Sequence, residues 1–229
     1  MNSEVIFLDQ LTKEYGNADN RFKAVDAVSF KINRGEFTAL VGPSGSGKTT
    51  LLNLMSGLDT PSSGTAYLAG KAISGMHGNE LSDFRRDHIG FIFQSYNLIP
   101  VLTAFENVEY ILLLQGVDPE ERKERVYQIL KEVGLSGKEN RRPTELSGGQ
   151  QQRVAVARAM VSRPDIILAD EPTANLDSHT GSALLDMMKE LNETKNITFV
   201  FSTHDQMIME RAKRLIILKD GRLFKDEVK

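Results

Sequence analysis

A glycine-rich segment over residues 42–50 has the composition to bind the phosphates of a nucleotide. It reads GPSGSGKTT, fits the pattern G-x-x-x-x-G-K-[ST], and lies between an apolar run at 37–41 and a helical pattern at 48–56. In that context backbone N–H groups can wrap phosphate oxygens, Lys48 can reach the β- and γ-phosphates, and the Thr49 hydroxyl can bind Mg²⁺. A plain turn that caps a helix is the alternative, and the strand–loop–helix context argues against it. The predicted phosphate-binding residues are Gly42, Pro43, Ser44, Gly45, Ser46, Gly47, Lys48, Thr49 and Thr50.

Two carboxylates follow another apolar run, which predicts a strand over 166–169. Asp170 and Glu171 stand directly after this run. Ligand sites in parallel sheets lie beyond the carboxyl ends of the strands, so we expect both side chains near the phosphate loop. Asp170 can then hold Mg²⁺ through water, and Glu171 can orient or deprotonate a water that attacks the γ-phosphate. The alternative is an acidic pair that merely ends a strand. The phosphate loop upstream favours the catalytic interpretation.

A second anion-binding device opens the helix predicted over 148–161. It is the run LSGGQ at 146–150, in which Ser147 has the position of an N-cap and Gly148 and Gly149 expose backbone N–H groups. An ordinary cap with flexible glycines is the alternative, but it leaves two phosphate-binding devices in one chain unexplained. A head-to-tail dimer explains them, because the second device of one copy can close over the γ-phosphate that the other copy holds.

The elements that position these groups alternate between strands and helices at both ends of the chain. Apolar runs predict strands at 5–8, 28–32, 37–41, 65–68, 89–93, 166–169, 197–201 and 215–218, the last followed by a tight turn at 219–222. Further helices are predicted from Thr103, which has capping-box spacing to Glu106, from Asp118, which precedes Pro119, and at 181–191 and 206–213. This alternation predicts a parallel sheet with helices on its faces and an inserted helical block between the two ends.

Composition excludes several classes of protein. The 229 residues contain no cysteine, which excludes disulfides, thiolate metal sites and a cysteine nucleophile. The net charge of −3 argues against a broad nucleic-acid-binding face. The longest apolar runs fall far short of the roughly 20 residues of a membrane-spanning helix, so we do not expect this sequence to cross a membrane alone.

In this order, the motifs resemble those of the nucleotide-binding ATPase subunit of ABC transporters. The segment at 42–50 resembles the family's phosphate loop, IILADE at 166–171 its acidic strand end, and LSGGQ at 146–150 its signature. The resemblance implies an α/β fold, a P-loop NTPase with a mixed or parallel sheet core, an N-terminal antiparallel β subdomain and an inserted α-helical subdomain. It implies one ABC ATPase domain over 1–229, with 1–94 and 163–229 as the catalytic core and 95–162 as the helical signature subdomain.

The same resemblance implies roles for further residues. Ser147 and Gly149, with Gly148 and Gln150 beside them, are expected to meet the γ-phosphate across the dimer. Asp177, in the run Asn175-Leu176-Asp177, falls in the loop that crosses the dimer interface. Gln94 is expected to touch Mg²⁺ and the attacking water, and His204 in FSTHD to contact the γ-phosphate. Tyr15 falls where the family has an aromatic residue that stacks on adenine, and the nearby Phe22 is the alternative.

The resemblance also implies a function. We expect an ATP-binding and ATP-hydrolysing subunit that uses ATP and Mg²⁺, dimerises with ATP at the interface, and drives a separate integral membrane permease from the cytoplasmic face of the membrane. The stretches 85–109 and 146–181 resemble the lipoprotein-release and macrolide-efflux branch, which favours export or mechanical transmission. The apolar Leu98, Ile99, Val101 and Leu102 are candidates for the membrane-subunit contact, with ordinary packing as the alternative. The alternative function is an ABC-type ATPase in nucleic-acid maintenance, which the lack of heptads and cysteines disfavours.

Overall fold

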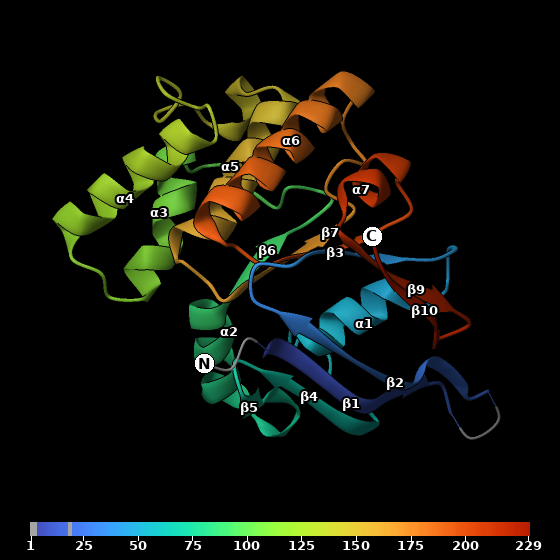
Figure 1. Cartoon of the computed structure of the whole chain (residues 1–229). Coiled ribbons are helices and arrows are strands. Elements are labelled where there is room, and N and C mark those ends of the chain that lie inside the picture. Colours follow the sequence, from blue (N-terminus) through green and yellow to red (C-terminus); the bar gives the residue numbers. More distant parts are fainter. Residues whose placement is uncertain (1–3, 18–19) are drawn as a thin grey trace.

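The structure, a computed structural model, contains two sheets and describes residues 4–17 and 20–229 (Figure 1). The N-terminal sheet is antiparallel, with strand order β2-β1-β4-β5. Its strands are β1 (Glu4–Tyr15), β2 (Phe22–Asn33), β4 (Ser63–Leu68) and β5 (Lys71–Ala72). The second sheet has strand order β10-β9-β3-β8-β7-β6 and is parallel except for β10. Its strands are β3 (Phe37–Val41), β6 (Ile89–Ile92), β7 (Ile166–Asp170), β8 (Phe199–Thr203), β9 (Arg214–Lys219) and β10 (Arg222–Val228).

More helices pack on one face of the six-stranded sheet than on the other (Figure 1). The helices are α1 (Lys48–Met55), α2 (Gly78–His88), α3 (Ala104–Leu114), α4 (Pro119–Glu132), α5 (Gly148–Val161), α6 (Ser178–Lys195) and α7 (Gln206–Arg211). Helices α3 to α7 cover one face, and α1 lies on the other. Short 3₁₀ turns occupy η1 (Ile73–Gly75) and η2 (Pro143–Glu145). The predicted α/β fold is confirmed, with its antiparallel N-terminal sheet, mixed core sheet and helical block. The division of the chain into a core and a subdomain over 95–162 stays a prediction.

The core sheet is buried on both faces, which explains the unbroken apolar runs of its strands. Side chains of a strand alternate between faces, so Ile166 and Leu168 of β7 pack on the side of α1 and the N-terminal sheet. Ile167 and Ala169 pack on the opposite side, against α3 to α7. Helix α5 approaches this face so closely that a Cβ on Gly90 would lie 2.2 Å from the carbonyl oxygen of Ala159.

The predicted helix starts are confirmed where the sequence carries a cap. The Thr103 hydroxyl accepts a hydrogen bond from the backbone N–H of Glu106. The Glu106 carboxylate in turn accepts one from the backbone N–H of Thr103, so the capping box is complete. Asp118 caps α4, with Pro119 at its first position. The predicted tight turn is confirmed by positive φ angles at Asp220 and Gly221.

Several boundaries were wrong by a few residues. Helix α7 stops at Arg211 rather than at 213, because the backbone N–H of Lys213 donates to Phe37 O in the neighbouring β3 region. Strand β8 starts at Phe199 rather than at 197, because Ile197 O instead accepts a 2.6 Å hydrogen bond from Asn192 of α6. Helix α2 was not predicted.

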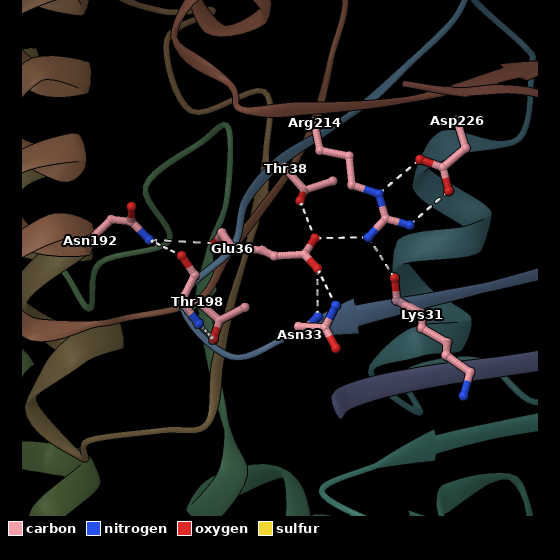
Figure 2. Close-up of polar contacts among 9 residues, drawn as sticks. Lys31, Asn33, Glu36, Thr38, Asn192, Thr198, Arg214 and Asp226 are labelled. Atoms are coloured by element: carbon pink, nitrogen blue, oxygen red, sulfur yellow. Dashed lines mark hydrogen bonds and ion pairs between the residues drawn. The ribbon is translucent and has the colours of Figure 1, made fainter. Parts of the chain in front are cut away.

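A polar cluster braces the two sheets at the end opposite the phosphate loop (Figure 2). Arg214 of β9 makes two hydrogen bonds of 2.8 and 2.7 Å to Asp226 of β10. It also donates to Glu36, just before β3, at 2.9 Å and to Lys31 O of β2 at 2.7 Å. These carboxylates raise the pKa of Arg214, with Asp226 the largest cause and burial opposing the rise. One guanidinium therefore joins the N-terminal sheet to the core sheet.

Candidate nucleotide-binding and hydrolysis site

The loop between β3 and α1 is held in a conformation that requires glycine. Gly47 precedes α1 with φ 98°, and a Cβ there would lie 2.3 Å from Ala24 O of β2. A Cβ on Gly42 would lie 2.3 Å from Leu218 O of β9. The turn after β9 braces the loop further, since Gly221 N–H donates to Ser46 O at 3.2 Å. Neighbouring strands and the turn after β9 thus fix the shape of the loop.

Lys48 lies over the loop and is 9% exposed. Its Nζ donates to the carbonyl oxygens of Gly42 at 2.8 Å and Pro43 at 3.1 Å. Among the residues that the structure describes, no carboxylate pairs with Lys48. Phosphate oxygens would give this ammonium charge-assisted hydrogen bonds, which are stronger than those to neutral carbonyls.

An oxygen-donor pair lies at the start of α1. Thr49 Oγ1 is 3.4 Å from both carboxylate oxygens of Asp170, which ends β7. Hydroxyl and carboxylate oxygens suit Mg²⁺, which is usually bound through one or two carboxylates plus substrate phosphates and water. Within residues 4–17 and 20–229 no group of three or more His, Cys, Asp or Glu could hold a metal ion. The fit to Mg²⁺ rests on the Thr49 hydroxyl and the Asp170 carboxylate beside the phosphate loop.

The carboxylate of Glu171 is fixed by two neighbours from the end of β8. One oxygen lies 2.6 Å from Nδ1 of His204, and the other accepts a 3.0 Å hydrogen bond from the Thr203 hydroxyl. Glu171 also has a left-handed backbone with φ 45°, a strained conformation for a residue other than glycine. Its side chain is 17% exposed, whereas His204 is 76% exposed. The arrangement holds an oriented carboxylate beside an accessible imidazole.

An open groove of about 760 Å³ joins these groups. It is lined by the loop from Ser44 to Thr50 and by Gln94, Glu171 and His204. The aromatic residues Tyr15 and Phe22 line it as well. Segments far apart in the sequence therefore converge on one groove that contains both the phosphate-type loop and aromatic side chains.

Two aromatic residues line the groove, Tyr15 and Phe22. The centroids of Tyr15 and Phe22 lie 5.8 Å apart, and the residues are 37% and 59% exposed. The Tyr15 hydroxyl donates to Asp59 at 2.5 Å, and burial and then Asp59 raise the pKa of Tyr15. Both rings face the groove, so both predicted candidates for adenine stacking stay open.

The LSGGQ residues lie outside this groove. Ser147 caps α5 by accepting from Gln150 N–H at 3.3 Å, and Gln150 Oε1 accepts from Ser147 N–H at 3.0 Å. Gly149 permits close packing, because a Cβ there would lie 2.3 Å from Cγ2 of Thr180 on α6. None of these residues lines the groove of its own chain.

The loop between β7 and α6 contains Asn175, which contacts Gln94, and Asp177, which caps α6. Asn175 Nδ2 donates to the carbonyl oxygen of Gln94 at 2.9 Å. Asp177 is the N-cap of α6 and accepts from Thr180 N–H at 3.0 Å, and hydrogen bonds from Thr180 lower the pKa of Asp177. Gln94 is thus inside the groove, while Asp177 lies outside it.

Sequence reasoning missed Thr203 and the wall formed by Lys23, Ala24, Asp220 and Gly221. The Asp220-Gly221 turn was recognisable as a turn, but nothing local indicated that it borders the phosphate loop. Thr203 carries no motif of its own before His204. Its hydrogen bond to Glu171 depends on the pairing of β7 with β8, in which Asp170 lies opposite Ser202.

Comparisons with known proteins agree on one family. The model of the family described as "ABC transporter" matches residues 25–174. The uncharacterized ABC transporter ATP-binding protein MJ1508 of Methanocaldococcus jannaschii is 47% identical over 211 residues, which cover 92% of this chain and 94% of the relative. The ABC transporter ATP-binding protein YtrE of Bacillus subtilis is 47% identical over 203 residues, covering 89% and 88% of the two chains. The macrolide export ATP-binding/permease protein MacB of Mannheimia succiniciproducens is 43% identical over 225 residues, which cover 98% of this chain but 35% of MacB.

A solved structure is similar along nearly the whole chain. It is the dimeric, post-hydrolysis state of the ATP-binding cassette MJ0796 bound to ADP and Pi, with a TM-score of 0.88 and 43% identity. The match covers 97% of this chain and 98% of that one. MJ0796 is itself an ABC transporter ATP-binding protein of M. jannaschii.

Proposed function

Because the chain belongs to the ABC transporter family and is an ATP-binding, ATP-hydrolysing subunit, we propose that its groove hydrolyses ATP with Glu171 as the general base. The observation that carries this proposal is the geometry around Glu171. Its carboxylate is oriented by Thr203 and His204 and borders the same groove as the phosphate loop. The nucleic-acid alternative is not favoured, since the relatives named above are transporter proteins.

In the proposed reaction Glu171 accepts a proton from a water molecule. The water oxygen attacks the γ-phosphorus, the bond from that phosphorus to the β,γ-bridging oxygen breaks, and ADP and phosphate leave. Lys48, held over the loop, offsets charge on the transferred phosphoryl group. His204 is accessible enough to contact the γ-phosphate while its Nδ1 faces Glu171. Gln94 borders the groove where it can orient the water.

Thr49 and Asp170 would hold Mg²⁺, with Gln94 as a further oxygen ligand. When bound, Mg²⁺ supplies charge that stabilises the phosphate oxygens during transfer. The Thr49 hydroxyl beside the Asp170 carboxylate supports this assignment.

Two copies of the chain would complete each site head to tail. Ser147, Gly148, Gly149 and Gln150 stand at the start of α5, outside the groove of their own chain. In the proposed dimer they reach the γ-phosphate held by the other copy, and Asp177 lies at the interface. The dimeric state printed for the MJ0796 cassette supports this arrangement.

A membrane subunit would bind on a different face. A second groove, of about 340 Å³, is lined by Phe91, Phe93, Ile99 and Tyr110. Val101 nearby in sequence is 72% exposed, whereas Leu98 packs against the core. No helix in the described part of the chain is long and apolar enough to span a membrane. We infer that this groove receives a cytoplasmic segment of a separate permease at the cytoplasmic face of the membrane. The permease named with the ATPase in MacB supports export as the direction.

The substitution Glu171→Gln tests the proposed base. It keeps the size of the side chain but removes its ability to accept a proton, so we expect ATP affinity within a few-fold of wild type and turnover lowered by about a hundredfold or more. Turnover is measured by phosphate release and affinity by a fluorescent ATP analogue. Glu193→Gln, in an exposed residue of α6 outside the groove, is the matched control and should hydrolyse ATP normally. Rapid hydrolysis by Glu171→Gln would eliminate Glu171 as the base.

A further inference from the structure

Two consecutive residues after Gln94 have a left-handed backbone. Tyr96 has φ 59° and Asn97 has φ 48°. Residues other than glycine keep such conformations only where the surrounding structure fixes them. The bonds inside the loop, from Tyr96 N to Phe93 O at 3.2 Å and from Asn97 N to Ser95 O at 2.6 Å, do not connect it to any other element.

Besides a 3.4 Å hydrogen bond from the Tyr96 hydroxyl to Asn175 O, the guanidinium of Arg158 connects the loop to helix α5. Its Nη2 donates to Tyr96 O at 2.9 Å, and its Nη1 donates to Asn97 O at 2.6 Å. The planar fork of arginine suits two acceptors that face the same way. In the described part of the chain Arg158 forms no ion pair with a carboxylate, and burial lowers the pKa of its guanidinium. Both terminal nitrogens of the guanidinium therefore bind these two carbonyls.

The loop and helix joined by Arg158 connect to three functional features: the LSGGQ segment, Gln94 and the proposed permease groove. Helix α5 begins with Gly148 of the LSGGQ segment, about 15 Å from Arg158 at 1.5 Å per residue. Gln94 precedes the loop in the sequence, and its carbonyl oxygen accepts a hydrogen bond from the side chain of Asn175. After the loop lies Ile99, which faces the proposed permease groove and is held by the buried Asn107 at 2.8 Å.

We propose that Arg158 is a positioning residue that locks the loop over 95–97 and thereby fixes Gln94 relative to the LSGGQ helix and the permease groove. This rests on the function proposed above. Arg158 does not line the groove around the phosphate loop. Loss of Arg158 therefore frees the loop. Gln94 is then no longer held in place, so hydrolysis slows while ATP binding stays intact.

The test compares Arg158→Gln with Arg153→Gln in the full chain. Arg153 is a matched control, because it stands on the same helix and also donates to a backbone carbonyl, Val133 O at 2.8 Å, away from the loop. Chymotrypsin cleavage within 95–102 and steady-state ATP hydrolysis are measured for each. We expect Arg158→Gln to raise the cleavage rate and to lower kcat, each by about tenfold, with KM within about twofold. Arg153→Gln should change neither, even if its melting temperature falls.

Equal cleavage of wild type and Arg158→Gln would overturn the proposal, as would an equal rise in Arg153→Gln. If Arg158→Gln does not fold, Arg158→Lys keeps the charge without the fork and should give intermediate values for both readouts. A wild-type chain that hydrolyses no ATP would refute the proposed function instead, and the cleavage comparison would still decide whether Arg158 locks the loop.

Discussion

Thr203 offers a sharp test of how Glu171 is oriented. The residue is 0% exposed, its hydroxyl donates to Glu171 at 3.0 Å, and its oxygen accepts from Asp205 N–H at 2.9 Å. Thr203→Val keeps the shape of the side chain and removes both hydrogen bonds. A hydrogen bond to a charged group contributes about 1.5–3 kcal/mol. If that energy is lost only in the transition state, kcat falls by roughly ten- to a hundredfold, since 1.36 kcal/mol corresponds to tenfold.

The assay is steady-state ATP hydrolysis, with kcat and KM determined separately. KM should stay within about twofold, because Thr203 does not line the groove. Thr203→Ser retains the hydroxyl and should recover most of kcat. Equal kcat values for the valine variant and wild type would refute the claim that Thr203 orients Glu171. Equal losses in the valine and serine variants would refute it too, because they would indicate a packing effect.

Three further changes test other parts of the structure. Lys48→Ala removes the ammonium over the phosphate loop and should weaken ATP binding by several kcal/mol, measured by titration calorimetry, with an unchanged Kd as the contrary result. Val101→Asp should abolish stimulation of the ATPase by the membrane subunit and leave basal hydrolysis intact, whereas Val228→Asp, similarly exposed at the far end of β10, should retain both stimulation and basal hydrolysis. Arg214→Met should lower the free energy of unfolding by about 3 kcal/mol and Tm by about 6–12 °C, because two partly buried carboxylates, Glu36 and Asp226, lose their cationic partner. A calorimetric Tm within 2 °C of wild type would contradict that role for the polar cluster.

Local patterns were sufficient to predict the phosphate loop and the caps. The run over 37–56 contains its own strand, glycine turn and helix, so the order of these elements follows from nearby residues, whereas β2 and β9 fix the shape of the loop. The capping boxes at Thr103 and Ser147 are similarly local, since donor and acceptor are three residues apart. Helix α2 was missed because Phe84 is its one buried residue, and a single buried apolar residue gives no apolar stripe.

Other features depend on contacts between distant segments. The hydroxyl of Thr203 meets Glu171 only because β7 and β8 are neighbours in the sheet. The fork of Arg158 meets Asn97 61 positions earlier, which no local pattern indicates. Which residue stacks on adenine, Tyr15 or Phe22, also stays open, because both line the groove from different strands.

The most direct test of the account measures the mass of Glu171→Gln in solution. In the proposed reaction two copies enclose ATP, and Glu171 is needed to hydrolyse it. By size exclusion with light scattering, Mg²⁺ and ATP should convert this variant from 25.5 kDa to a stable dimer of about 51 kDa, whereas ADP should not. Adding Ser147→Arg, which blocks the second phosphate-binding device, should return it to a monomer. A Glu171→Gln chain that binds ATP yet stays at 25.5 kDa would contradict the account.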